Sequence, residues 1–175
     1  MLPDLDSLID NEDISLWGKF FGLFGLGSNE LIVVTYGAVS DVNERLNSLD
    51  SVDSVATLLL VPTARPTTDE QRTKEGLYVF RRFAVNHKDV EEIADLSKEA
   101  WKSFENTDEY QAIPQALFCQ GDRSQERGTM LLVTWYDGLN SWQTSRTPPG
   151  NAGENFRRRG QITLSTTATA TRLLT

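Results

Sequence analysis

The chain has 175 residues and a mass of 19.6 kDa, which fits one ordinary domain or two small, closely coupled ones. With 39% hydrophobic and 24% charged residues, its composition is that of a globular protein and excludes a disordered or collagen-like chain. The formal net charge of −8 argues against a protein that binds nucleic acid or an anionic membrane by electrostatic attraction.

The single cysteine, Cys119, cannot form an internal disulfide, and the single histidine, His87, offers little for a transition-metal site. We expect no metal and no cofactor. Residues 1–13 are acidic and lack the basic and apolar regions of a secretory signal. The apolar run 58–64 is interrupted by Pro62 and is too short to span a bilayer. A cytoplasmic protein without a membrane span is therefore predicted.

The first part of the chain predicts a sheet with one short helix. Aromatic and β-branched runs indicate strands, and apolar residues at helical spacing indicate the helix. The predicted elements are a strand at 16–24, a turn at 25–30, a strand at 31–36, a helix at 41–49 and a strand at 55–61. A polar stretch with two prolines follows, and we interpret 65–75 as a linker.

The second part begins again at Gly76 with a strand whose alternate residues point to opposite faces. Arg81 shares the face of Leu77, Val79 and Phe83. The next segment has an apolar stripe from Val90 to Phe104 and predicts an amphipathic helix. Further predicted elements are strands at 114–119 and 130–136 around a hairpin loop, a short helix at 139–145, a loop at 147–156 and a Thr-rich strand at 161–174.

These two parts resemble each other. The order in the second is β-α-β-β-α-β, which is the ferredoxin-like arrangement, whereas the first begins at the second strand of that plan. We therefore predict an α+β fold with antiparallel sheets and helices outside. It is divided into a partial repeat at 1–64, the linker at 65–75 and a complete repeat at 76–175.

Residues 16–49 resemble the second half of a NIPSNAP-type domain, because an aromatic strand, a glycine turn ending in Asn-Glu, an apolar strand and a short Arg-bearing helix follow one another. Residues 76–105 look like the first strand and helix of the same group. The resemblance implies a dimeric α+β barrel, in which two ferredoxin-like units join their sheets. The missing first strand and helix of the first repeat depart from that family's pattern.

A sheet with helices on one face leaves its other face bare, and strands such as 76–85 and 130–136 are apolar on both sides. At roughly 25 cal/mol per Å² of apolar area, leaving that face in water would be costly. A second sheet must cover it, from the same chain, from a second chain, or from both. The resemblance to dimeric barrels adds the expectation of a homodimer.

His87 stands after the first strand of the complete repeat and could act as a general base, although a solvated polar residue in a first helical turn is the simpler interpretation. The aromatic residues Tyr36, Tyr78, Trp101 and Trp135 could bind a flat or greasy ligand, although such residues more often belong to a core.

Three other features have a functional and a structural interpretation. Residues 1–70 hold twelve acidic and three basic residues. The arginines at positions 81, 82, 157, 158 and 159 could bind a carboxylate or phosphate, although pairing with these acids or exposure to solvent is the simpler interpretation. Cys119 fits a buried small hydrophobe better than a nucleophile. The glycines of 22–27 match no phosphate-binding motif and indicate a bulged strand entering a turn.

The sequence supports two functions. The first is binding of a small hydrophobic or aromatic molecule, with cofactor-free catalysis as an extension. The resemblance implies this function, because barrels of that superfamily include monooxygenases, isomerases and cyclases. The alternative is a non-catalytic binding or assembly module with a packed barrel. A sizeable cavity inside the barrel, with a polar group such as His87 or a tyrosine hydroxyl, favours the first function. A filled barrel interior without a pocket favours the second.

Overall fold

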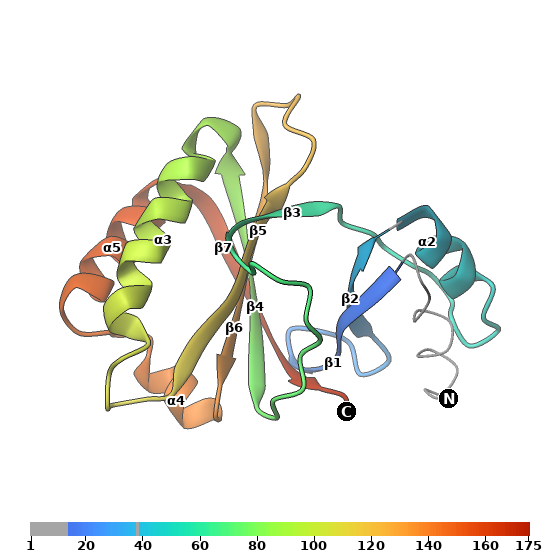
Figure 1. The fold of residues 1–175 in the computed structure, drawn as a ribbon, viewed down its shortest axis with the longest axis horizontal. Helices are drawn as coiled ribbons and strands as arrows, with labels where there is room; N and C mark the ends of the chain where they lie inside the picture. Colours follow the sequence, from blue (N-terminus) through green and yellow to red (C-terminus); the bar gives the residue numbers. More distant parts are fainter. Residues whose placement is uncertain (1–13, 38) are drawn as a thin grey trace.

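The computed structural model describes residues 14–37 and 39–175. The acidic stretch 1–13, which lacks the features of a secretory signal, lies outside the described residues. In chain order the elements are β1 (Ile14–Phe24), β2 (Leu31–Gly37), α2 (Val39–Asn47), β3 (Leu60–Arg65), β4 (Leu77–Asn86), a 3-10 turn η1 (His87–Asp89), α3 (Val90–Phe104), β5 (Ala112–Gln120), β6 (Arg127–Tyr136), α4 (Leu139–Thr144), α5 (Gly150–Gln161) and β7 (Thr163–Leu173) (Figure 1).

The strands of the second part stand in the order β7-β4-β6-β5, and each is antiparallel to its neighbours. The first strand of this unit, β4, lies between the third and the fourth, as a ferredoxin-like module requires. Helix α3 connects β4 to β5, and helices α4 and α5 connect β6 to β7.

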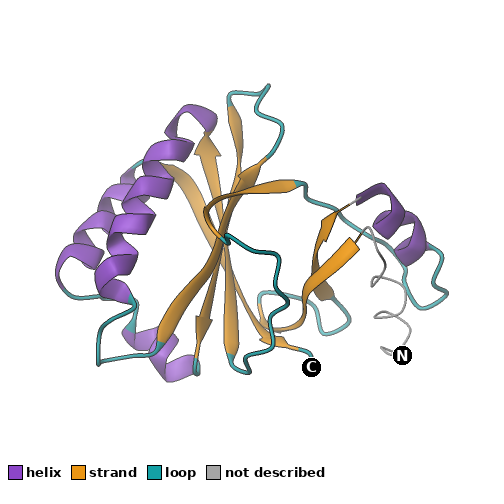
Figure 2. Ribbon diagram, in the orientation of Figure 1, coloured by secondary structure: helices purple, strands orange, loops and turns teal. Residues whose placement is uncertain are grey.

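The first part of the chain extends this sheet at both edges. Strand β1 pairs with β7 and carries β2 on its other side, whereas β3 pairs with β5. One seven-stranded antiparallel sheet results, in the order β2-β1-β7-β4-β6-β5-β3. The sheet curls, and the helices lie on its outside (Figure 2). The predicted fold class is confirmed.

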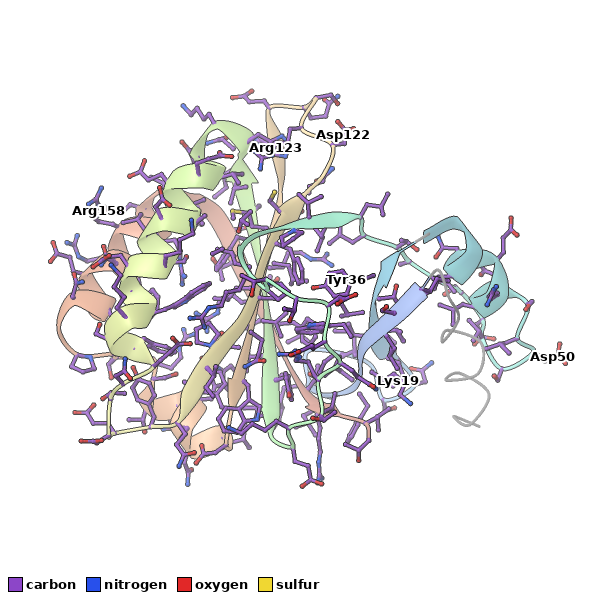
Figure 3. The ribbon with its side chains drawn as sticks, viewed as in Figure 1. Lys19, Tyr36, Asp50, Asp122, Arg123 and Arg158 are labelled. Atoms are coloured by element: carbon purple, nitrogen blue, oxygen red, sulfur yellow. The ribbon has the colours of Figure 1, made fainter. Side chains whose placement is uncertain are left out.

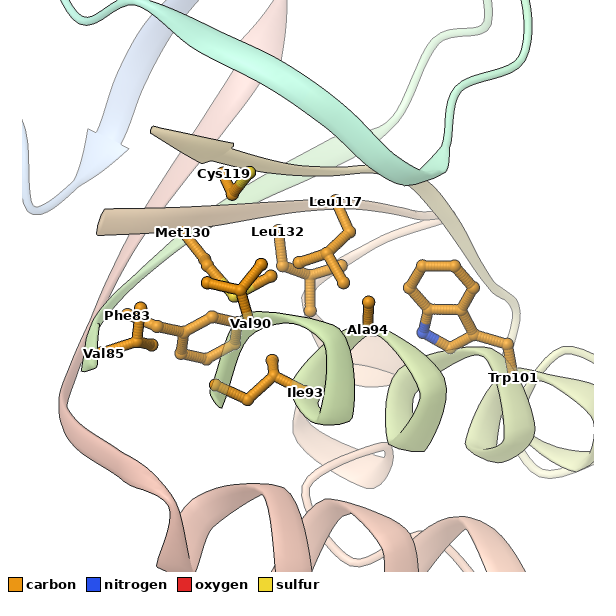
Figure 4. Packing of buried hydrophobic residues seen from close by; sticks show 10 residues of the cluster. All are labelled: Phe83, Val85, Val90, Ile93, Ala94, Trp101, Leu117, Cys119, Met130 and Leu132. Carbon is orange, nitrogen blue, oxygen red and sulfur yellow. The ribbon is translucent and has the colours of Figure 1, made fainter. Parts of the chain in front are cut away.

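Helices α3 and α5 cover the outer face of the central strands. We call the apolar layer in which α3 packs against β4, β5 and β6 the outer cluster (Figure 4). Its buried members are Phe83, Val85, Val90, Ile93, Ala94, Trp101, Leu117, Cys119, Met130 and Leu132. The apolar stripe predicted from Val90 to Phe104 is buried throughout. Burial of this stripe, rather than helix propensity alone, stabilises α3.

The inner face of the sheet carries the inner cluster, whose buried members are Trp17, Phe20, Tyr78, Phe80, Ala116, Phe118, Val133, Trp135 and Leu173. Several rings meet there at tilted or edge-on angles; Phe20, for example, lies 5.0 Å from both Tyr78 and Phe80 between ring centroids. Strands β1 and β2 fold over this face and supply its cover. The alternation predicted for β4 is confirmed, because Tyr78 and Phe80 point inward and Val79 and Phe83 point outward.

The connecting segment 66–76 runs along the inner side of the sheet between β3 and β4 (Figure 1). The backbone N–H of Arg72 donates to the carbonyl of Trp17 over 2.7 Å, and the indole N–H of Trp135 donates to the carbonyl of Glu75 over 2.8 Å. The ammonium group of Lys74 lies 3.3 Å from the centre of the Trp135 ring. The connecting segment therefore helps to close the inner cluster.

Two predicted boundaries are wrong. The strand expected at 55–61 is β3, at Leu60–Arg65, and it includes Pro62. Because β3 is an edge strand, a proline without an N–H costs it no hydrogen bond on its free side. The loop expected at 147–156 is largely helix α5, whose glycines and asparagine suggested a loop but whose buried residues face α3. In the described part of the chain, no helix is long and apolar enough to cross a membrane.

Candidate functional site

A cavity of about 420 Å³ lies between the outer face of the sheet and helices α3 and α5. Strands β4 and β6 form its floor, and the connection from α4 to α5 forms one side. We call it the arginine cavity; its lining residues include Arg81, Arg146, Arg157 and Arg159, together with Phe83, Trp101, Phe104, Thr134, Tyr136 and Phe156. No acidic residue lines it among the described part of the chain.

Two elements bring Arg81 and Arg159 to this cavity. Arg81 lies in the middle of β4, where the period of two turns its side chain to the face of Val79 and Phe83. Arg159 lies in the last turn of α5 and is only 5% exposed. A cation at a helix C-terminus is favoured by the helix dipole, although burial works against its charge.

Arg159 is held by one hydrogen bond and two aromatic rings. Its Nη1 donates to Oγ of Ser97 over 3.1 Å, and Ser97 in turn donates to the carbonyl of Ile93. The guanidinium carbon lies 4.5 Å from the centre of the Phe156 ring and 5.0 Å from that of Phe83. These contacts fix the planar group at the wall of the cavity.

Burial and a neighbouring positive charge disfavour the charged form of both Arg81 and Arg159. Burial, together with the neighbouring charge of Arg81, lowers the pKa of Arg159 to about 9. Burial also lowers the pKa of Arg81, and the charge of Arg146 adds to that effect. Among the described residues, no carboxylate forms an ion pair with either arginine. Both remain cations at neutral pH.

The structure separates the arginines that the sequence grouped. Arg157 lines the cavity with Arg81 and Arg159, and Arg146 joins them from the turn after α4. Arg158 points away from the sheet and pairs with Glu92 of α3 on the surface (Figure 3). Arg82 is exposed and, by the alternation of β4, belongs to the inner side of the sheet.

The predicted aromatic residues also fall on two sides of the sheet. Trp101 of α3 belongs to the outer cluster and lines the arginine cavity. Tyr78 and Trp135 belong to the inner cluster, and Tyr36 of β2 packs against them from the partly buried rim. These four side chains therefore do not form one site.

The connecting segment satisfies two of the polar groups at the inner cluster, those of Tyr78 and Trp135. The hydroxyl of Tyr78 donates to the carbonyl of Lys74 over 2.8 Å, and burial raises the pKa of Tyr78 to about 12. Burial likewise raises the pKa of Tyr36 to about 12, with the charge of Arg72 working against the shift. The hydroxyl of Tyr36 and the indole nitrogen of Trp17 have no hydrogen-bond partner among the described residues.

His87 lies in η1, at the end of β4, and is not among the residues that line the arginine cavity. Its Nδ1 is 2.6 Å from the carbonyl oxygen of Gln125, and its backbone N–H donates to the carbonyl of Glu126. The ring is 9% exposed and rests against Gly128. This placement ties the 3-10 turn to the loop between β5 and β6, and catalysis by His87 stays a prediction.

Cys119 is fully buried in the outer cluster. Arg123, on the hairpin loop above it (Figure 3), donates to its sulfur over 3.0 Å and also pairs with Glu91 of α3. The residue acts as a small apolar group within the packing.

Sequence reasoning missed the cavity and the part of Arg146 in it. One signal was available, because Arg81 stands alone among apolar residues on its strand face. Arg159 was named among the candidate arginines, but no pattern placed it on a buried face, since the segment before it was expected to be a loop as far as 156.

No protein-family model matches the chain, and no curated protein matches it. Solved structures do resemble it. An anthrone oxidase-like protein has 11% identity and a TM-score of 0.63, over 99% of this chain and 84% of that chain. A proposed monooxygenase from Fusobacterium nucleatum has 9% identity and a TM-score of 0.52, over 95% of this chain and 78% of that chain. A proposed monooxygenase from Lactobacillus acidophilus has 11% identity and a TM-score of 0.52, over 97% and 80%. At these identities the likeness establishes the fold, which is that of the dimeric α+β barrel class.

Proposed function

We propose that the protein binds a small aromatic or hydrophobic molecule in the arginine cavity. The observation that carries this proposal is the cavity itself, whose volume of about 420 Å³ lies in the range of small-molecule sites. Aromatic walls from Trp101, Phe104 and Phe156 would supply apolar contact and ring stacking.

The inner face of the sheet carries the packing that the alternative, a non-catalytic module with a packed barrel, predicts. Its buried aromatic side chains contact one another, and Trp135 donates to the connecting segment. The small-molecule proposal therefore depends on the open volume of the arginine cavity on the outer side. A role for Tyr36, Tyr78 and Trp135 in ligand binding stays a prediction, and Trp101 is the member of that set in the proposed site.

Native mass spectrometry tests the proposal. It detects a co-purified small molecule, and it measures how much of an added naphthalene-sized compound binds to the protein. Thr134 lines the cavity and is 4% exposed, so a larger side chain there would occupy the free volume. We expect Thr134→Phe to weaken binding at least tenfold and Thr134→Val, which keeps the volume, to retain it. If no aromatic compound binds the wild type, or if Thr134→Phe binds as well as wild type, the proposal is wrong.

Catalysis on the bound molecule is a second candidate function, favoured by the proposed monooxygenases and the anthrone oxidase-like protein among the structural neighbours. Oxygen uptake in the presence of a compound found to bind tests it. The variant His87→Ala tests the predicted general base. If its oxygen uptake equals that of the wild type, His87 takes no part in the reaction.

We also propose that the chain forms a homodimer and that it is a NIPSNAP-like protein. The dimer is supported by β2, an edge strand of seven residues without a charged residue or proline. The family proposal depends on the residue patterns of 16–49 and 76–105.

A further inference from the structure

We propose that the ligand of the arginine cavity is an aromatic oxyanion, whose carboxylate or phosphate lies between Arg81 and Arg159. This inference rests on the proposed function and adds the charge of the ligand to it.

The first argument is the uncompensated charge of the cavity. Arg159 is 5% exposed and Arg81 is half-buried, and a buried cation is costly unless an anion or several hydrogen-bond acceptors compensate it. The cavity is lined by four arginines and by no acidic residue among those described. Within the described part of the chain, no carboxylate pairs with Arg81 or Arg159 to balance this charge.

The second argument is the supply of unused donors. A guanidinium group has five N–H donors in a planar fork that matches an oxyanion. Among the described residues, the guanidinium of Arg159 donates one hydrogen bond, to Ser97, and the guanidinium of Arg81 donates none. Both guanidinium groups line the cavity, so their remaining donors are available to a ligand in it.

The third argument concerns rigidity. Arg159 is stacked by Phe83 and Phe156 and anchored by Ser97, so little conformational freedom remains to be lost when an anion binds. The same aromatic side chains line the cavity and leave room for a ring attached to the anion. Arg146 and Arg157 are exposed as well as lining the cavity, which favours the approach of an anion from their side.

The pKa values agree with this geometry. The pKa of Arg159 is lowered to about 9 by burial and by the charge of Arg81. An oxyanion between the two groups would stabilise both charged forms and raise that pKa toward its ordinary value.

The experiment compares two ligands of equal shape. Calorimetric titration of the 175-residue chain with naphthoate and with naphthamide separates the contribution of the negative charge from that of the rings. We expect naphthoate to bind at least tenfold more tightly than naphthamide. A third titration, with naphthyl phosphate, distinguishes a carboxylate site from a phosphate site, because the tighter of the two anions identifies the preferred group.

Two variants and one control locate the charge effect. In Arg81→Met and Arg159→Met the preference for naphthoate over naphthamide should fall to within about twofold, since methionine keeps the apolar contact and removes the donors. Arg158→Met should keep the full preference, because Arg158 pairs with Glu92 on the surface. Thermal unfolding without ligand checks the fold, and Arg159→Met should be at least as stable as wild type because an unpaired buried charge is removed.

The possible failures are distinct. Equal binding of naphthoate and naphthamide by wild type, or an unchanged preference in both cavity variants, overturns this inference and leaves the proposed function standing. If neither naphthoate, naphthamide nor naphthyl phosphate binds, the proposed function fails and this inference fails with it.

Discussion

Arg81 shows how a single residue in a strand pattern can indicate a site. It occupies an outward position of β4, between residues that form the apolar face, and an arginine there must lose water when the helices pack. In this fold the cost is reduced by the cavity, which keeps the guanidinium in contact with open volume. In this fold, the charged residue at a core position of the strand therefore lies beside open volume.

His87 and Gly128 are a second case in which the two residues explain each other. A Cβ atom at position 128 would lie 1.9 Å from Nε2 of His87, and the imidazole cannot move freely because its Nδ1 faces the carbonyl of Gln125. Glycine is required here by the space that the ring occupies rather than by backbone conformation.

At this scale we predict that Gly128→Ala lowers the free energy of unfolding by about 1–3 kcal/mol through overpacking. Chemical denaturation measures the loss. Gly121→Ala in the same hairpin is the control, because its Cβ would meet only Val61 at 3.6 Å, and it should stay within about 0.5 kcal/mol of wild type. The double variant with His87→Ala should recover most of the loss, and a loss that persists would contradict the explanation.

At the scale of elements, the connecting segment 66–76 does more than join two strands. Its proline and polar residues are typical of a linker, yet its backbone carbonyls accept hydrogen bonds from Tyr78 and Trp135 at the inner cluster. Because these acceptors are backbone atoms, the polar composition of the segment gives no indication of them.

The pH dependence of stability should report the contact between this segment and β4. The pKa of Tyr78 is raised to about 12, above its ordinary value of 10.0, so the folded protein keeps a phenolic proton that the unfolded chain loses. The sign follows from proton linkage: this contribution is fully present below pH 10.0 and is lost as the pH rises toward about 12.

We therefore expect the free energy of unfolding to fall between about pH 10 and 12, by about 2 kcal/mol for a fully buried phenol. Urea titrations across this interval measure the slope. In Tyr78→Phe the free energy of unfolding should fall less steeply with pH. Part of the fall should remain, because the pKa of Tyr36 is also raised to about 12. A slope that is identical in both proteins would contradict the assignment to Tyr78.

Helix α5 is the element that sequence patterns missed. Its segment follows two prolines and contains glycine and asparagine, which are typical of loops. Its helical structure depends on packing, because Ala152, Asn155 and Arg159 are buried and the helix lies against α3. Tertiary contact outweighs local propensity here.

At the scale of the whole molecule, the sheet of the described residues curls but its two edge strands do not pair with each other, so both edges can pair with another chain. In the described part of the chain, β2 and β3 are the edges of the seven-stranded sheet. Strand β3 contains Pro62 and ends at Arg65, two features that discourage further pairing, whereas β2 has neither.

The proposed homodimer should therefore depend on the edge formed by β2. We predict that Leu31→Lys, at an exposed position of β2, shifts the monomer–dimer equilibrium toward monomer at least tenfold, because a buried lysine at the interface loses its hydration. Sedimentation equilibrium measures the constant. Val61→Lys, on the edge formed by β3 and also exposed, is the matched control. If both substitutions act alike, the interface does not lie at β2.

Local patterns in the chain were sufficient to predict the ferredoxin-like order of the second part, the buried stripe of α3 and the two faces of β4. These features follow from periods of 3.6 and 2, which each segment carries without reference to the rest of the chain. The sequence also named Arg81 and Arg159 as candidates in one group of arginines, and Trp101 in a separate aromatic set.

The packing of the elements, in contrast, determines that these three side chains line one cavity, and that Tyr36, Tyr78 and Trp135 lie across the sheet from it. Pattern arguments assign a residue to a face of its own element but not to a partner, because the curl of the sheet and the packing of α5 on α3 bring together positions far apart in the chain. The empty volume between the layers is a property of that packing, and no single segment contains it.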